Sequence, residues 1–252
     1  MTLVEEYKNQ NRWRDWGRYL DKIPLDKNQI VYDLGCGMGD VSRMLSYKVK
    51  RVVGFDNNTF LLEAADKNKP NNCKFIVDNI FTLDPSKLEK CDGIWTSFAM
   101  AYMESPNLFL SNWVKALHSN GWFAIVDIDG LFSNHLPQHN RYFRDIDLFE
   151  KEAETSKIYD FRIGKKIKKI MEYNGLDIIV AEEDWYDREL NFKGKASPEV
   201  VEAWKNRLER MVRLKTYLGD KYSSFSKELL HVISEEDHKS HGGVKFYVGI
   251  KR

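Results

Sequence analysis

Three glycines at alternate positions, Gly35, Gly37 and Gly39, follow directly after a short apolar run. Glycine adopts positive φ without steric cost and lets a ligand approach the main chain without meeting a Cβ atom. Residues 30–34 predict a buried strand, and Asp40 begins a segment that predicts a helix, whose first free N–H groups point back over the turn. The spacing therefore predicts a strand, a tight turn and a helix that together bind a nucleotide-like ligand.

The acids beside the turn indicate which ligand it binds. A dinucleotide-binding turn carries a third glycine at the position of Asp40, and a phosphate-binding loop carries a lysine that residues 40–42 lack. An acid next to a pyrophosphate repels it, whereas Asp33 and Asp40 suit a ligand with ammonium and sulfonium charges. S-adenosylmethionine is such a ligand, so the residues favour it over a nicotinamide dinucleotide.

The segment that carries these residues resembles the first motif of the class I S-adenosylmethionine-dependent methyltransferases. Its letters, Asp33-Leu34-Gly35-Cys36-Gly37-x-Gly39, match that motif almost completely. The resemblance implies an α/β fold with a doubly wound, seven-stranded, mostly parallel sheet of Rossmann-like type, an antiparallel last strand and helical cap inserts. It also implies S-adenosyl-L-methionine as the cofactor and S-adenosyl-L-homocysteine as its product.

Two further predicted strands also end in an acid, Asp56 and Asp78. Since the carboxyl ends of the first two strands lie side by side in a doubly wound sheet, Asp56 is expected to accept both ribose hydroxyls. The resemblance implies that Asp78 accepts the adenine amine and that Phe60 or Leu61 lies near the adenine. Arg12 or a neighbour is expected to pair with the cofactor carboxylate. The residues expected to bind the cofactor are Asp33, Gly35, Cys36, Gly37, Gly39, Asp56, Asn57, Phe60, Asp78, Asn79, Ile80, Ser97, Phe98 and Arg12.

The loop after the fourth predicted strand, residues 97–102, indicates the class of acceptor. Families that methylate amide or exocyclic amino nitrogens usually carry Asn/Asp-Pro-Pro-Tyr/Phe at this point, and this loop has no Pro-Pro pair. Its letters, Ser-Phe-Ala-Met-Ala-Tyr, are similar to those of small-molecule methyltransferases, in which the loop wraps the cofactor. Tyr102 at its end is therefore a candidate substrate contact.

An acceptor that loses a proton needs a group to take it, and the catalytic candidates are His135, His139 and Tyr102. A dedicated base is optional, because the methyl is already activated and transfer depends mainly on in-line positioning. Asp127 and Asp129 near the end of the fifth predicted strand could bind a cationic amine or a metal. Two carboxylates without a third ligand are poor support for a metal, so no metal site is predicted.

Composition limits the possible partners. The 252 residues carry 39 Lys and Arg against 38 Asp and Glu, a formal net charge of +1, which argues against a nucleic-acid partner. The three cysteines, Cys36, Cys73 and Cys91, lack metal-ligand spacing and predict reduced thiols. The sequence shows neither a signal-peptide pattern nor an apolar run of spanning length, so a cytoplasmic protein without a membrane partner is expected. A small-molecule acceptor is the expected partner, and both a monomer and a homodimer stay open.

The expected helices and strands that position these residues alternate along the chain. A helix over residues 3–22 with an aromatic face comes first, and residues 119–121 are expected to end a helix over residues 107–118. Apolar residues at helical spacing place another helix from Pro198 through Val212. Its basic residues, interpreted as a solvated face rather than a phosphate-binding patch, are Lys205, Arg207, Arg210 and Arg213. The other expected helices span about 40–48, 59–68, 144–156, 163–174 and 224–233, and the strands about 30–34, 51–56, 73–80, 91–97, 122–130, 176–185 and 244–250.

The expected organisation is a single domain with two inserts. The N-terminal helix and the cofactor-binding core occupy residues 1–130, a cap insert 131–160, the continued core 161–185, a second helical insert 186–243 and the final core strand 244–252. Inserts of this length in a compact domain are usually functional or disordered, and the aromatic residues of the first insert favour a functional role.

The predicted function is transfer of a methyl group from S-adenosylmethionine to a nitrogen or oxygen of a small-molecule metabolite or natural product. Two alternatives stay open. One is a methyltransferase that acts on RNA or protein, and the other is a module of the same fold that holds the cofactor without turnover. A nicotinamide-dependent dehydrogenase is disfavoured by Asp40.

Overall fold

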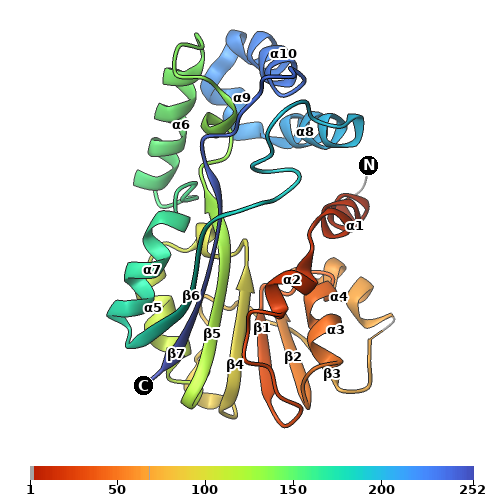
Figure 1. Ribbon diagram of the computed structural model, residues 1–252, viewed down its shortest axis with the longest axis vertical. Helices are drawn as coiled ribbons and strands as arrows, with labels where there is room; N and C mark the ends of the chain where they lie inside the picture. The colour runs from red at the N-terminus through yellow and green to blue at the C-terminus, as the bar shows by residue number, and fades with distance from the viewer. Residues whose placement is uncertain (1–2, 68) are drawn as a thin grey trace.

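The computed structural model describes residues 3–67 and 69–252, and within them the strands form one seven-stranded sheet (Figure 1). The strand order is β3-β2-β1-β4-β5-β7-β6, in which β1 to β5 pair in parallel and β7 runs antiparallel to both of its neighbours. The strands are β1 Ile30–Leu34, β2 Arg51–Asp56, β3 Cys73–Val77, β4 Cys91–Ser97, β5 Leu117–Asp129, β6 Leu176–Trp185 and β7 Gly243–Lys251. The predicted doubly wound sheet with an antiparallel last strand is confirmed.

Helices flank this sheet and build a cap beyond one of its ends. The α-helices are α1 Leu3–Trp13, α2 Trp16–Leu20, α3 Asp40–Ser46, α4 Thr59–Asp66, α5 Pro106–Val114, α6 Phe143–Thr155, α7 Gly164–Tyr173, α8 Pro198–Arg210, α9 Val212–Leu218 and α10 Tyr222–Val232. Short 3-10 helices are η1 Pro85–Lys87, η2 Met100–Tyr102, η3 Ser133–His135 and η4 Gly219–Lys221. None of the helices in the described part of the chain combines the length and apolar character needed to cross a bilayer.

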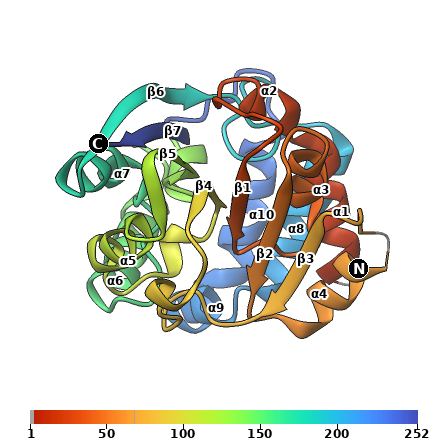
Figure 2. The ribbon, with the colours of Figure 1, turned by 90° about the horizontal axis from the view of Figure 1, so that it is seen from below.

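Consecutive residues of the central strands face opposite sides of the sheet. Val31 and Trp95 pack in the cluster that includes α2 and α3, whereas Tyr32 and Ile94 pack in the cluster that includes α5 and α7. Figure 2 shows α3 on one side of the sheet and α5 and α7 on the other. Strands buried on both faces carry near-continuous apolar runs, which is why the sequence predicts them well.

The predicted N-terminal helix over residues 3–22 is wrong in one respect, because it breaks into α1 and α2. Asp15 stands at the break and caps α2, its carboxylate accepting a hydrogen bond from the backbone N–H of Arg18 at 3.2 Å. Trp16 and Tyr19 of α2 are buried, whereas Tyr7 of α1 is 37% exposed. Because the chain changes direction at this break, α1 lies beside the cap and away from the sheet, whereas α2 lies nearer the strands (Figure 1).

The predicted helix over residues 107–118 is shorter than expected. It ends at Val114, and Leu117 already begins β5 by pairing with Cys91 of β4. Asn120 does take the left-handed conformation, with φ of 64°, but inside an irregular stretch of β5 and not as a helix cap. The pairing with β4 therefore overrides the local helix-ending signal.

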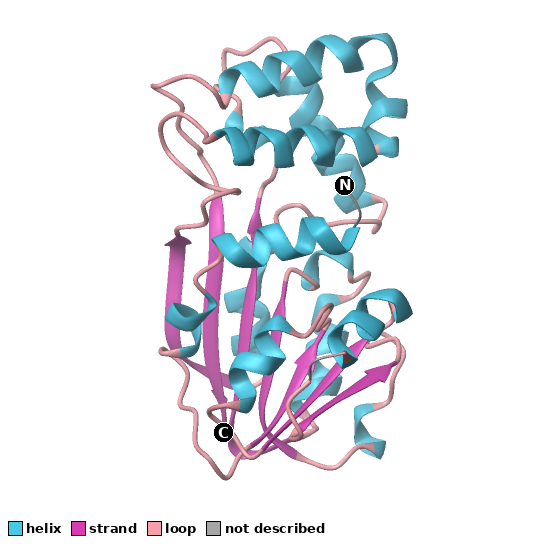
Figure 3. Cartoon of the chain, turned by 90° about the vertical axis from the view of Figure 1, so that its right-hand side faces the viewer, coloured by secondary structure: helices cyan, strands magenta, loops and turns pink. Residues whose placement is uncertain are grey.

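The cap consists of α8, α9 and α10, with α6 alongside (Figures 1 and 3). The predicted helix through Val212 ends at Arg210, because Met211 leaves the helical conformation with ψ of 68°, and α9 follows as a helix that the sequence did not predict. Trp204 and Phe132 are fully buried, and their rings meet edge to face at 5.9 Å. This packing fixes the cap over the carboxyl ends of the strands.

Candidate functional site

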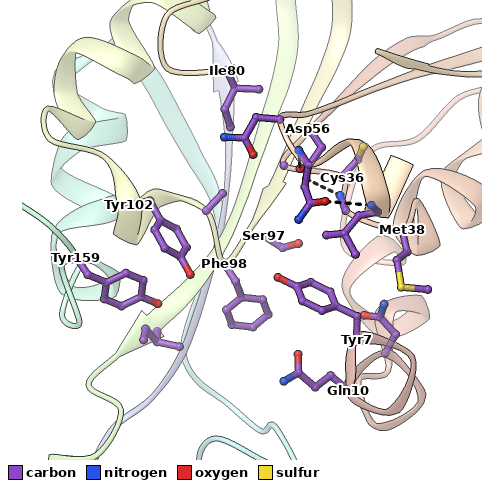
Figure 4. A pocket seen from close by; sticks show the side chains of 18 of the residues that line it. Tyr7, Gln10, Cys36, Met38, Asp56, Ile80, Ser97, Phe98, Tyr102 and Tyr159 are labelled. Carbon is purple, nitrogen blue, oxygen red and sulfur yellow. Dashed lines mark hydrogen bonds between the residues drawn. The ribbon is translucent and has the colours of Figure 1, made fainter. Parts of the chain in front are cut away.

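A cavity of about 720 Å³ lies between the carboxyl ends of the central strands and the cap. The glycine turn, the ends of β2 and β4, the N-terminal helices and the cap all contribute to its lining. Figure 4 shows Tyr102 and Tyr159 across the cavity from Tyr7 and Met38, with Phe98 between them. Of the predicted cofactor residues, those that line it are Asp33, Gly35, Cys36, Gly37, Asp56, Asn57, Asn79, Ile80, Ser97 and Phe98.

The glycine turn forms the floor of this cavity. Gly35, Gly37 and Gly39 have φ of 74°, 52° and 71°, which confirms that each stands where side chains are strained. The backbone N–H groups of Gly35 and Cys36 donate to the carbonyl oxygen of Phe55 and join the turn to β2. Burial raises the pKa of the Cys36 thiol well above its usual value, so this thiol stays protonated and unreactive.

Gly39 supports the turn from beneath and does not line the cavity. A Cβ atom at this position would lie 2.4 Å from Cζ of Phe75. The third glycine therefore serves the packing of α3 against the neighbouring strand, and we assign it no ligand contact.

Asp56 links the ends of the first two strands. Its Oδ2 accepts a hydrogen bond from the Gly37 N–H at 2.8 Å, and its Oδ1 accepts one from the Asn58 N–H at 2.9 Å (Figure 4). Each carboxylate oxygen has a second lone pair, so Asp56 can also accept hydrogen bonds from a ligand in the cavity.

Asp33 is a second carboxylate at the cavity, and it is 2% exposed. The hydroxyl of Ser42 donates to its Oδ2 at 2.5 Å. Burial raises the pKa of Asp33 to about 7, the negative charge of Asp56 adds to the shift, and the Ser42 hydrogen bond opposes it. A cationic ligand nearby would favour the ionised form.

Besides Gly39, three other predicted cofactor residues do not line the cavity: Asp78, Phe60 and Arg12. The Asp78 carboxylate accepts a hydrogen bond from the N–H of Asn79 at 2.7 Å and so shapes the loop after β3. Phe60 is 58% exposed, and its neighbour Leu61 lines the cavity instead. Arg12 is exposed, since it lies on the outer side of α1.

Arg14, two positions beyond Arg12, does line the cavity. Its Nε pairs with Oδ2 of Asp187 at 3.0 Å, and its Nη2 lies 3.6 Å from Oε2 of Glu189. Its Cζ lies 4.3 Å from the ring centroid of Phe98, in reach of a cation–π contact. Burial opposes its charge, but Asp187 and Glu189 outweigh that effect and raise the pKa of Arg14.

Tyr102 reaches the cavity from η2, directly after β4. Its ring lies edge to face on Tyr159, with the centroids 4.7 Å apart (Figure 4). Desolvation by the surrounding protein raises the pKa of the Tyr102 hydroxyl, and the charge of Asp127 adds to this. Tyr102 is therefore a phenol at neutral pH, able to donate a hydrogen bond but not to act as a phenolate base.

The two histidine candidates lie apart from Tyr102. His135 is fully buried in the cap, where its Nδ1 lies 3.1 Å from Nε2 of His238. Burial lowers the pKa of His135 well below its usual value, and His238 adds to this. His139 is exposed and lines a separate cavity of about 620 Å³ together with Asp129. Neither histidine lines the first cavity, so the structure does not bring them to the methyl-transfer site that the sequence suggested.

Asp127 and Asp129 do not line the first cavity either. Asp127 is fully buried, and its Oδ1 accepts a hydrogen bond from the Ile128 N–H at 2.8 Å. Asp129 pairs with Lys165, with Oδ1 and Nζ 3.2 Å apart. Within residues 3–67 and 69–252 no three potential ligands among His, Cys, Asp and Glu gather around a common point.

Several lining residues gave no usable signal in the sequence. They are Tyr7, Gln10, Asn11, Arg14, Tyr159, Arg207, Arg210 and Arg213. The last three belong to the basic residues interpreted as a solvated face. Arg210 and Arg213 are exposed, as that interpretation expects, but all three also line the cavity. Helical spacing shows which residues share a face, but only the packing of the cap shows what that face meets.

A family model described as "Methyltransferase domain" matches residues 25–211. This chain belongs to that family. The matched segment contains the glycine turn, Asp56, the loop after β4 and α8, so it includes both sides of the cavity. Membership in the methyltransferase domain family implies S-adenosylmethionine as the cofactor, and the family expected from the first motif is confirmed.

The comparisons with individual proteins are more distant. Trans-aconitate 2-methyltransferase of Agrobacterium fabrum is 28% identical over 123 residues, which cover 48% of this chain and 47% of that protein. The match thus spans about half the length of these curated relatives.

Two solved structures share the fold. A Bacillus halodurans C-125 protein provisionally assigned as a methyltransferase has a TM-score of 0.64 and 19% identity, covering 94% of this chain and 98% of that one. Phosphoethanolamine N-methyltransferase 2 of Haemonchus contortus, in complex with S-adenosyl-L-methionine, has a TM-score of 0.57 and 19% identity, covering 95% of this chain and 52% of that one. At these identities the two structures support the fold alone.

Proposed function

We propose that this protein transfers a methyl group from S-adenosylmethionine to a nitrogen or oxygen of a small molecule. One observation carries the proposal: a single cavity joins the glycine turn and Asp56 on one side to the aromatic and basic residues of the cap on the other. Ser97 at the end of β4 and Tyr102 in the loop after it line the same cavity (Figure 4). A donor and an acceptor can therefore meet within one cavity.

The residues on the strand side fit the adenosyl donor. Asp56 offers carboxylate lone pairs to ribose hydroxyls, and Leu61 and Ile80 offer apolar contacts to the adenine. Arg14 takes the place proposed for Arg12 as the partner of the donor carboxylate. When bound, S-adenosylmethionine supplies a methyl group on a sulfonium sulfur, and it needs no further activation.

The protein's part in the reaction is mainly positioning. In-line placement of the acceptor accounts for much of the rate gain in such reactions. We propose that Tyr102, which lines the cavity and has a protonated hydroxyl, donates a hydrogen bond to the acceptor. With both histidines outside the cavity, we propose no dedicated base.

The name of the curated relatives supports a small molecule as the acceptor. Trans-aconitate 2-methyltransferase is named for a small organic substrate. A formal net charge of +1 further disfavours a polynucleotide acceptor. Oxygen and nitrogen both remain within the proposal.

Calorimetry and methyl transfer test the proposal together. S-adenosylmethionine and S-adenosylhomocysteine are titrated into the protein, which is then incubated with methyl-tritiated donor and separate low-mass, RNA and protein fractions of a cell extract. We expect heat with both ligands and label in the low-mass fraction. Absence of heat would refute the cofactor, label in RNA or protein would refute the acceptor class, and binding without any transfer would indicate a non-catalytic module.

A pair of variants controls this experiment. Asp56→Ala removes the proposed ribose acceptor, whereas Asp66→Ala removes an exposed carboxylate that pairs with Lys69 and does not line the cavity. Transfer should fail in the first variant and persist in the second. Equal transfer in both would show that the label does not come from this cavity.

A further inference from the structure

The two walls of the cavity carry opposite charge. The donor wall is formed by Asp33, Gly35, Cys36, Gly37 and Asp56, and the acceptor wall by Phe149, Phe161, Arg207, Arg210 and Arg213. The carboxylates that line the cavity in the described part of the chain are at positions 33, 40 and 56, all on the strand side. Its lining residues between 128 and 213 include no acid. Asp40 pairs with Arg43 at 2.8 Å, so the negative charge of the strand side comes from Asp33 and Asp56, opposite the arginines of the cap.

Part of the positive charge is already compensated. Arg207 pairs with Glu189 at 2.5 Å, and Arg14 pairs with Asp187 at 3.0 Å. Glu189 also lies 3.6 Å from Arg14, so two arginines and two carboxylates form one neutral group beside the cavity. This group explains why neither carboxylate repels an anion that enters the cavity.

Arg213 keeps its charge available. It is exposed at the cavity, and within residues 3–67 and 69–252 no carboxylate forms an ion pair with it. It follows Met211, where the chain turns from α8 into α9, and this turn brings it to the same cavity as Arg207. An arginine presents a planar set of donors that matches carboxylate and phosphate oxygens.

Apart from the arginines and Tyr159, this side is largely apolar. Phe149, Phe161 and Met211 line it, together with Ile158 and Leu131. Sites of this kind bury most of a small ligand against apolar side chains and fix its orientation with few polar contacts. An acceptor that fits must therefore have an apolar body.

We propose that the acceptor is an organic anion with an apolar body, whose charged group is held by Arg213 and whose body packs on the acceptor wall. This inference rests on the proposed function, since it names the substrate class of that same cavity. The opposite charges of the walls direct a cationic donor to one side and an anionic acceptor to the other. An amine with an apolar body would meet positive charge and bind weakly.

Three probes of one shape test the proposal: 4-phenylbutyrate, 4-phenylbutan-1-ol and 4-phenylbutylamine. Each is titrated into the protein saturated with S-adenosylhomocysteine, and binding is measured by calorimetry. We expect the carboxylate to bind about tenfold more tightly than the alcohol, because a charge-assisted contact is stronger than a neutral one. The amine should bind most weakly, and the preference for the carboxylate should shrink as salt is raised.

Variants assign the effect to its residue. Arg213→Gln should remove the preference and leave the affinity for the alcohol within about twofold, and Arg213→Lys should restore part of it. Arg144→Gln is the matched control, since Arg144 is also exposed but lines neither cavity. It should behave as the unmodified protein.

The outcomes separate the two proposals. If S-adenosylhomocysteine does not bind, the proposed function fails. If it binds but the alcohol or the amine equals the carboxylate, if no carboxylate binding is detected, or if the preference survives in Arg213→Gln, the anionic acceptor is refuted while the cofactor site stands.

Discussion

The donor wall and the acceptor wall face the same cavity but are built in different ways. The donor wall comes from one segment of 24 positions, residues 33–56, and depends largely on backbone groups and on glycines that take positive φ. The acceptor wall gathers side chains from α6, α8, α9 and the segment before α7. A wall built from backbone groups and glycines at positive φ tolerates few substitutions. A wall built from side chains can be substituted without altering the sheet. The comparison explains how one fold can keep its donor while varying its acceptor.

The cap offers the largest expected effect on stability. Trp204 is fully buried, and its Nε1 donates to the carbonyl oxygen of Glu189 at 3.0 Å. Trp204→Ala should lower the free energy of unfolding by about 3–5 kcal/mol in chemical denaturation. Tyr173→Ala, at a residue that is 79% exposed, should change it by less than about 0.5 kcal/mol.

Trp204→Ala also tests whether ligand binding at the donor wall is independent of the packing of the cap. If it is, S-adenosylhomocysteine should bind folded Trp204→Ala with an affinity within about twofold of the unmodified protein. A much weaker affinity would show that the cap supports the donor wall, and the comparison would fail.

Asp56 carries the largest expected effect on the donor. Asp56→Ala removes the acceptor of two backbone hydrogen bonds as well as the proposed contacts with ribose. Loss of the two proposed hydrogen bonds between the ribose hydroxyls and the charged carboxylate should raise the Kd for S-adenosylhomocysteine about 100-fold, measured by calorimetry. Asp66→Ala should leave the Kd unchanged, and a similar loss in both variants would contradict the assignment of the donor wall.

The third glycine of the turn tests the role of packing. Gly39 and Gly175 have similar φ values of 71° and 76°, but a Cβ atom meets Phe75 at the first and nothing within 4 Å at the second. Both alanine variants should lose about 1 kcal/mol of stability to backbone strain, and Gly39→Ala should lose about 1–3 kcal/mol more. Equal losses in thermal unfolding would show that Phe75 can move aside.

Asp33 carries the smallest expected effect, a dependence on pH. Its pKa is raised to about 7 in the ligand-free protein, and the ionised form attracts a cationic donor. The affinity for S-adenosylmethionine should therefore rise about tenfold between pH 5.5 and pH 8 and level off above pH 7. Asp33→Asn should flatten this dependence in calorimetry.

Stability should move in the opposite direction. Between its usual pKa and about 7, Asp33 holds a proton in the folded protein but not in the unfolded chain. The ligand-free protein should thus lose stability as pH rises through this window, with no further loss from Asp33 above it. A melting temperature that rises with pH in the unmodified protein and in Asp33→Asn alike would contradict the assignment.

Predictions from sequence succeeded where short-range constraints decide the structure. The turn residues Gly35 and Gly37, the acid Asp56 and the buried strands were all predicted, because adjacent residues suffice to specify a tight turn or a strand buried on both faces. Breaks within helices were not predicted. The apolar stripe that predicts a helix continues past Arg210, the last residue of α8, so nothing in the sequence marks the end of the helix. Only the packing of the cap shows that the chain turns at Met211.

The sequence predicted least well the positions of side chains that are held by residues far away in the chain. Arg12 and Arg14 differ by two positions, yet only Arg14 faces the cavity, since Asp187 and Glu189 hold it there from 173 and 175 positions away. His135 was a candidate base in the sequence, but in the structure it packs against Trp204 and His238.

Sequence alone determined the succession of strands and turns and the glycines and acids that meet at the cavity, because those depend on φ preferences, apolar runs and acids at strand ends. The tertiary structure alone decided which arginines, aromatics and tyrosines share the cavity with that wall. Such a choice depends on how helices separated by a hundred residues or more pack on one another, and no spacing along the chain encodes that packing directly.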